Sequence, residues 1–139
     1  MKDRQGTFWI GTYYGGVNLF NPDYEIYTYY YPDEAQKGKL TSPFAGRMIE
    51  DSKGGIWIAT EGGGVNYLDR KTRTFTEYKH DVSKNSLASN TIQSLFLDED
   101  NQALWIGTLR GGLDRLDLKT YRFTNYRYNA EKKLSLIHI

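Results

Sequence analysis

The sequence contains no cysteine among its 139 residues, which excludes disulfide bonds and metal sites built from thiolates. It also lacks an excess of charge, because 18 basic and 17 acidic residues leave a formal net charge of +1. This balance gives no electrostatic reason to expect nucleic acid or an anionic membrane surface as a partner. We therefore expect no nucleic-acid partner and no membrane contact by this segment.

Long apolar runs and helical patterns are missing as well. No apolar run approaches the ~18 residues of a membrane helix, and residues 1–4 lack the apolar stretch of a signal peptide. No window shows a sustained helical stripe. Instead, short runs rich in β-branched and aromatic residues lie between glycine, aspartate and asparagine, which predicts strands at residues 56–60, 64–69, 74–79 and 91–98.

A repeat is the strongest signal in the sequence. Trp9, Trp57 and Trp105 are evenly spaced, since 57 − 9 = 48 and 105 − 57 = 48. Many other residues recur at the same offset of 48, including the second residue of a glycine pair, at Gly16, Gly64 and Gly112. A fixed period of this size indicates a repeat architecture before any local pattern is considered.

Four predicted strands in each 48-residue unit describe one blade of a β-propeller. The strand around Trp57 is apolar on both faces, as expected for a sheet packed between two neighbouring sheets. We therefore predict an all-β propeller fragment of about three four-stranded antiparallel blades, with an incomplete ring. A partial blade that lacks its first strand covers residues 1–31, and further blades cover 43–79 and 91–128.

Three segments carry a family resemblance: FWIGTYYGGVN at 8–18, IWIATEGGGVN at 56–66 and LWIGTLRGGLD at 104–114. Together with SLASN at 86–90 and DRKT at 69–72, they resemble the two-component regulator propeller repeat over roughly residues 3–133. The resemblance implies the extracytoplasmic sensor region of a hybrid two-component histidine kinase of the Bacteroidetes type. It further implies a periplasmic location, a carbohydrate signal and a parent protein that could be homodimeric.

The repeated tryptophans and glycines are interpreted as structural. Trp9, Trp57 and Trp105 could stack on sugar rings, but their identical place in each repeat indicates that they fill the space between blades. The glycine pairs are followed by neither Lys-Ser nor Lys-Thr, so they indicate hairpin turns with positive φ at Gly16, Gly64 and Gly112 rather than phosphate loops. Asp3, Asp51 and Asp98 precede turns, where carboxylates usually bond the local backbone.

Ligand binding is expected where the repeats differ. The turn after each tryptophan strand and the crossovers at 32–43 and 80–90 are expected on one face of a propeller, and their sequences vary. The candidate ligand-binding residues are Tyr13 and Tyr14 for stacking, and Glu61 and Arg110 for polar contacts.

No catalytic constellation is recognisable. His80 stands alone without a carboxylate or cysteine pattern, so we predict no catalytic residues, no metal site and no cofactor. The favoured function is a carbohydrate-sensing module that signals to a histidine kinase outside this chain, with neighbouring blades and an oligosaccharide as partners. The alternative is a structural or protein–protein interaction propeller of a cell-surface or periplasmic assembly, and a propeller enzyme is a third class.

The two ends of the sequence break the repeat. Residues 134–139 (LSLIHI) read like the in-frame translation of a transposase sequencing adapter, and the first repeat lacks a counterpart to 91–98. We therefore expect a fragment that cannot close a ring, since propellers need about four to eight blades. Its end blades are expected to leave apolar faces in water.

Overall fold

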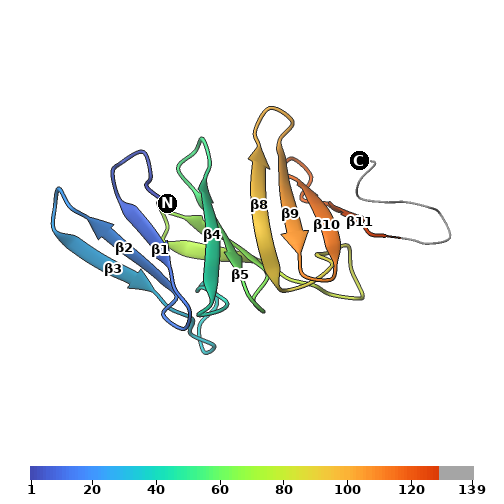
Figure 1. Cartoon of the computed structure of the whole chain (residues 1–139), viewed down its shortest axis with the longest axis horizontal. Helices are drawn as coiled ribbons and strands as arrows, with labels where there is room; N and C mark the ends of the chain where they lie inside the picture. The colour runs from blue at the N-terminus through green and yellow to red at the C-terminus, as the bar shows by residue number, and fades with distance from the viewer. Residues whose placement is uncertain (129–139) are drawn as a thin grey trace.

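The computed structural model describes residues 1–128, which form three antiparallel sheets standing in a row (Figure 1). The first blade contains β1 (Phe8–Gly11), β2 (Val17–Asn21) and β3 (Ile26–Tyr30). The second contains β4 (Ala45–Glu50), β5 (Ile56–Thr60), β6 (Val65–Asp69) and β7 (Thr74–Tyr78). The third contains β8 (Ile92–Asp98), β9 (Ala103–Thr108), β10 (Gly112–Asp117) and β11 (Phe123–Tyr126).

The predicted fold class is confirmed. Within residues 1–128 every regular element is a strand, each sheet follows chain order, and none of the sheets closes into a ring. The predicted adapter-derived segment at 134–139 lies outside the described residues. Residues ahead of β1 extend the first blade, because Lys2 forms a bridge with Phe8 and the Trp9 amide donates to the Met1 carbonyl at 2.7 Å.

Two apolar cores hold the three blades together. In the first core, Trp9 and Val17 of the first blade pack with Ile56, Ile58 and Leu68 of the second. In the second core, Trp57 and Val65 occupy the place of Trp9 and Val17, and they pack with residues of the third blade, among them Leu104, Ile106 and Leu116. The 48-residue repeat therefore produces the same contact twice.

The junction between the first two blades also contains an ion pair. The Arg70 guanidinium lies 2.9 Å from a carboxylate oxygen of Asp3, 3.5 Å from Glu50 and 5.4 Å from the Trp9 ring centroid. Asp3 additionally accepts hydrogen bonds from the Trp9 indole N–H at 2.7 Å and the Thr7 amide at 2.9 Å. Burial alone raises the pKa of Asp3, but these hydrogen bonds and the charge of Arg70 outweigh it and lower the pKa below its usual value.

The next junction is built differently at the same repeat positions. Leu118 stands 48 residues after Arg70 and packs against the second apolar core. Asp51, the counterpart of Asp3, accepts a hydrogen bond from the Tyr67 hydroxyl at 2.9 Å, and the buried Trp57 indole N–H has no hydrogen-bond partner. The second junction thus depends on apolar and aromatic contacts where the first contains charges.

Removing the indole between the second and third blades tests the importance of the repeated core. Trp57 is 3% exposed, so Trp57→Ala is expected to lower the free energy of unfolding by about 3–5 kcal/mol. Chemical denaturation followed by circular dichroism measures this loss. Tyr24→Ala is the control, because Tyr24 is 73% exposed and its loss should change stability by less than ~1 kcal/mol. Equal losses in the two variants would contradict the assigned packing.

The ion pair at the first junction predicts a pH-dependent substitution effect. Arg70→Leu should lower the free energy of unfolding by about 1–3 kcal/mol at neutral pH, because the buried Asp3 would keep its charge without its cation, while Glu50 would retain only Arg4. A carboxyl group whose pKa is lowered by folding stabilises the fold at pH values above its usual pKa. This stabilisation is lost as the pH falls through the lowered pKa of the folded protein. The difference between wild type and variant should therefore shrink towards about pH 3.

The control for this experiment is the adjacent, exposed Lys71. Lys71→Leu leaves the contacts of Asp3 in place and should change stability little at either pH. A pH-independent effect of Arg70→Leu would show that the side chain acts through packing alone.

Candidate functional site

One edge of the blades forms a continuous surface, which we call the turn face. It consists of the turns at residues 12–16, 61–64 and 109–111 and the crossovers at 31–44 and 79–91, along the lower side of the molecule in Figure 1. Backbone hydrogen bonds join turn to crossover at repeated positions. The Gly16 amide donates to the Pro43 carbonyl and the Gly64 amide to the Asn90 carbonyl, both at 2.8 Å. The turn face is therefore fixed to the blades beneath it.

Buried polar side chains hold the crossovers in place. Asn66 accepts from the Thr41 amide at 3.1 Å and donates to the Thr41 hydroxyl at 2.7 Å. Its repeat counterpart Asp114 accepts from the Ala88 amide at 2.8 Å and from the Asn125 amide group at 2.7 Å. Burial raises the pKa of Asp114 above its usual value despite these two bonds. Each crossover is thus held by hydrogen bonds to the third strand of the blade that follows it.

The glycine pairs allow the close approach of turn and crossover. The second glycine of each pair has positive φ, with 66° at Gly16, 74° at Gly64 and 91° at Gly112. At Gly63, the first member of its pair, a Cβ atom would collide with the side chains of Thr41, Ser42 and Thr60. One glycine therefore supplies the backbone conformation and the other supplies the space.

Tyr13 and Tyr14 lie together in the first turn and remain largely exposed, at 71% and 64% of their surface. Both contact Phe44 of the following crossover, with ring centroids 4.8 Å from Tyr13 and 4.6 Å from Tyr14. The two tyrosines meet edge to face at 4.8 Å. The result is a cluster of three aromatic rings at the surface.

Sequence reasoning missed Phe44, which lies one residue beyond the crossover considered there. A signal was available, because Ser42-Pro43-Phe44 aligns with Ser89-Asn90-Thr91 in the next repeat. Because the other copy has threonine at this position, the packing of the blade does not require an aromatic residue there.

The remaining candidates lie on the same face but not in one cluster. The Glu61 amide donates to the Phe44 carbonyl at 3.0 Å, so the backbone of the second turn lies beside the aromatic cluster. Arg110 lies in the third turn at an open recess of about 350 Å³, formed with Ala88, Ser89, Thr91, Leu109 and Gly111. The structure therefore brings Tyr13, Tyr14 and the Glu61 backbone together and places Arg110 at a separate turn.

Two of the candidates have an unusual backbone conformation. Tyr14 has φ of 73° and Arg110 has φ of 61°, while Gly62 occupies the same turn position in the second blade with φ of 82°. Left-handed conformation costs a non-glycine residue about 1 kcal/mol or more. Tyrosine and arginine therefore occupy positions where glycine would be less strained.

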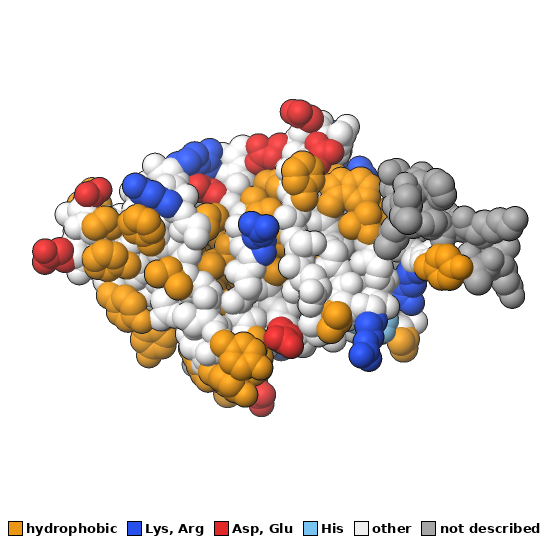
Figure 2. Space-filling model, viewed as in Figure 1, with side chains coloured by type: hydrophobic (Ala, Val, Ile, Leu, Met, Phe, Trp, Pro, Cys, Tyr) orange, Lys and Arg blue, Asp and Glu red, His pale blue; other side chains and the backbone are white. Residues whose placement is uncertain are grey.

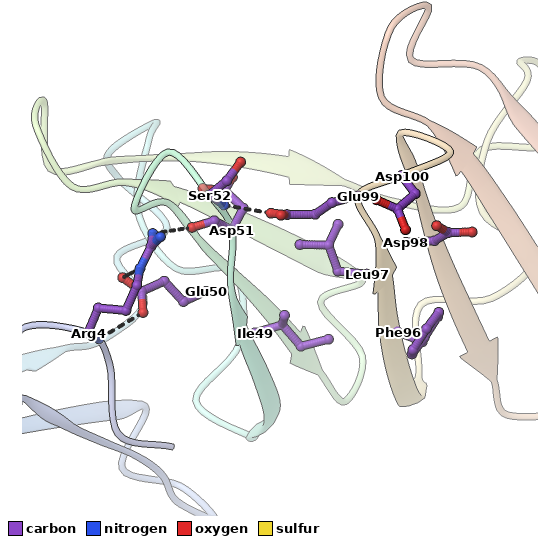
Figure 3. A pocket seen from close by; sticks show the side chains of 10 residues that line it. All are labelled: Arg4, Ile49, Glu50, Asp51, Ser52, Phe96, Leu97, Asp98, Glu99 and Asp100. Carbon is purple, nitrogen blue, oxygen red and sulfur yellow. Dashed lines mark hydrogen bonds and ion pairs between the residues drawn. The ribbon is translucent and has the colours of Figure 1, made fainter.

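The opposite edge of the blades contains a cleft of about 520 Å³ between the β4–β5 and β8–β9 turns (Figure 3). Its polar groups bond one another, because Arg4 pairs with Glu50 at 3.3 Å and Glu99 accepts from the Ser52 amide at 2.6 Å. Asp51 accepts the amides of Lys53 and Gly55, both at 2.9 Å. The cleft is acidic, but no group of three or more potential metal ligands occurs within residues 1–128.

His80 belongs to the crossover bonding of the turn face. Its ring Nδ1 lies 2.6 Å from the Leu87 carbonyl, and its amide donates to the Asn90 side chain at 2.7 Å. The described residues also include no helix long and apolar enough to cross a membrane.

Comparison with known proteins identifies the repeat. The family model described as "Two component regulator propeller" matches residues 39–62 and 86–110. No curated protein sequence matches the chain significantly.

Several solved structures share the fold. The extracellular domain of BT3049 of B. thetaiotaomicron, assigned as a hybrid two-component system, is 25% identical over 91% of this chain, with a TM-score of 0.79. The corresponding domain of BT4673 from the same organism is 26% identical over 87% of this chain, with a TM-score of 0.70. PorZ, a surface component of the type-IX secretion system of Porphyromonas gingivalis, is 24% identical over 81% and shares the fold, with a TM-score of 0.63.

This chain spans 17% of the BT3049 structure and 16% of the BT4673 and PorZ structures. The resemblance to the two-component regulator propeller repeat is confirmed by both the family match and the structural neighbours. Residues 39–62 and 86–110 thus match the two-component regulator propeller repeat, and the chain is similar over most of its length to extracellular domains of hybrid two-component systems.

Proposed function

We propose that this chain is a ligand-sensing part of a bacterial two-component sensor and that its turn face contributes to ligand recognition. The observation that carries this proposal is its similarity to two extracellular domains of hybrid two-component systems, at 25% and 26% identity. A periplasmic location and a histidine kinase elsewhere in the parent protein are further parts of this proposal.

The proposed ligand is a carbohydrate. The exposed rings of Tyr13 and Tyr14 offer apolar faces of the size of a sugar ring, and both pack against Phe44. The side chains of Glu61 and Arg110 add a carboxylate and a guanidinium on neighbouring turns, which suits a ligand rich in hydroxyl groups.

The backbone strain at Tyr14 and Arg110 supports a role for this face. A residue held in a costly conformation that glycine could adopt freely is a recognised indication of function. Here both residues with this conformation, Tyr14 and Arg110, have exposed side chains. Binding by a rigid surface, rather than catalysis, is the role that these residues suit.

Loss of the tyrosine rings should weaken carbohydrate binding. A glycan array on the full chain identifies a ligand, and calorimetry then compares wild type with Tyr13→Ala/Tyr14→Ala. We expect the affinity to fall at least about tenfold, since losing ring contacts at the centre of a binding surface costs more than ~1.4 kcal/mol. Tyr24→Ala, an exposed tyrosine outside the turn face, should leave the affinity unchanged.

A negative result in the binding experiment would contradict the proposed ligand site. If no glycan binds, or if binding persists unchanged without Tyr13 and Tyr14, the turn face of these blades does not recognise carbohydrate.

Strain at Arg110 predicts a gain in stability on substitution. Arg110→Gly should raise the free energy of unfolding by up to about 1 kcal/mol, because glycine tolerates φ of 61° without steric cost. The neighbouring Leu109→Gly is the control and should be destabilising, because its φ is not positive and glycine adds chain entropy there. Denaturant midpoints measure both changes, and a destabilised Arg110→Gly would show that the arginine side chain stabilises the turn.

A further inference from the structure

A small recess lies between the second and third blades, beside the cleft of Figure 3 and therefore at the edge opposite the turn face. Its volume is about 80 Å³, and it shares Asp51 and Glu99 with that cleft. A space of this size holds a few water molecules or a group of about four heavy atoms. Its aromatic walls are formed by Trp57, Tyr67, Tyr78 and Tyr121.

The recess lies where the first junction holds a guanidinium group. At that junction Arg70 lies over the Trp9 ring at 5.4 Å and pairs with Asp3 at 2.9 Å. Leucine carries no charge, so the second junction has the aromatic ring and the carboxylate of the first but no cation at this position. The residues that line the recess at the corresponding places, 48 residues later in the chain, are Leu118, Trp57 and Asp51.

Two polar features of the recess point to a ligand. Among the described residues, the buried Trp57 indole N–H has no hydrogen-bond partner, whereas the Trp9 indole donates to Asp3 at 2.7 Å. Within residues 1–128, neither Asp51 nor Glu99 forms an ion pair. Buried polar groups and carboxylates gain stability from hydrogen bonds and opposite charges, so both features favour a polar, positively charged occupant.

The surroundings of the recess are negatively charged. Asp98, Glu99 and Asp100 follow one another at the end of β8, and acidic side chains gather there at the upper edge of the molecule in Figure 2. Lys53 also lines the recess, and its exposed side chain offsets part of this charge. A surface with one predominant sign of charge raises the local concentration of opposite charges, which here are cations.

We propose that this recess binds the guanidinium group of a small molecule, at a site separate from the carbohydrate surface. The planar cation would lie against the aromatic walls, as Arg70 lies over Trp9, and would donate to Asp51 and Glu99. The Asp51 carboxylate accepts three hydrogen bonds in the structure. Since a carboxylate offers about four acceptor positions, one is left for the ligand.

The first junction also indicates what binding would do to Trp57. There, the same oxygen of Asp3, Oδ2, accepts from both the Trp9 indole and the Arg70 guanidinium. A guanidinium in the recess would draw the Asp51 carboxylate towards the same arrangement, and the Trp57 N–H would gain an acceptor. The indole proton of Trp57 is therefore a specific reporter of the bound state.

Titration of the full chain with ethylguanidinium chloride at constant ionic strength tests the site. Proton–nitrogen correlation NMR follows the indole signals of the three tryptophans, and Trp57→Phe identifies the signal of Trp57. We expect this signal to move downfield and to saturate with a Kd of about 1 mM, as befits a ligand of few atoms. Ethylurea, which has the same shape without the charge, should leave the signal unchanged.

Three variants locate the binding. Glu99→Gln keeps an acceptor for the Ser52 amide but removes the charge, and should weaken binding about fivefold. Leu118→Arg places a guanidinium where Arg70 lies in the first junction and should abolish binding. Asp100→Asn is the matched control, because Asp100 lines the acidic cleft but not the recess, and it should change the affinity less than about twofold.

Three results would each overturn the proposal: a Trp57 signal that does not respond to ethylguanidinium, an equal response to ethylurea, or equal weakening by Asp100→Asn and Glu99→Gln. The last would show that the whole cleft attracts cations without a defined site. Circular dichroism verifies that Leu118→Arg is folded, and if it is not, the comparison of Glu99→Gln with Asp100→Asn decides. None of these results depends on the glycan experiment.

Discussion

The structure depends on one contact, in which a tryptophan and a tyrosine of one blade fit against the aliphatic and phenylalanine side chains of the next. Isolated four-stranded sheets expose two apolar surfaces and gain stability mainly by stacking. Trp9 and Trp57 are the buried tryptophans at these contacts, and Ile56, Ile58 and Leu104 are among their fully buried aliphatic partners. Everything at the edges of the blades, including the turn face, is positioned by this stacking.

The side chains of the turn face can vary because other residues hold its backbone in place. Asn66 and Asp114 secure the crossovers from below, and the paired glycines leave room for the close approach of the backbone. Positions such as Tyr13, Phe44 and Arg110 are then not constrained by the packing of blade against blade, and their residues can differ between repeats. A constant frame with variable edges is the usual way in which one fold supports different ligands.

The repeat spacing was sufficient to predict the strands, the sheet class and the positions of the tryptophans, because each follows from residues that recur in every copy. Features present in only one copy could not be predicted in this way. Arg70 fills a position taken by leucine in the next blade, and its pairing with Asp3 depends on the distance between two different sheets. The contact of Phe44 with Tyr13 and Tyr14 likewise joins segments about 30 residues apart, and only the crossover path brings them together.

The different chemistry of the two junctions has a consequence for how the assembly would respond to its surroundings. Because the carboxylate of Asp3 is fully buried, dissolved ions screen its attraction for Arg70 only weakly, and protonation in acid is what removes this attraction. Cooling instead weakens the burial of apolar surface, on which the second junction depends more heavily. Acidic pH would therefore weaken the contact between the first two blades, and low temperature would weaken the contact between the last two.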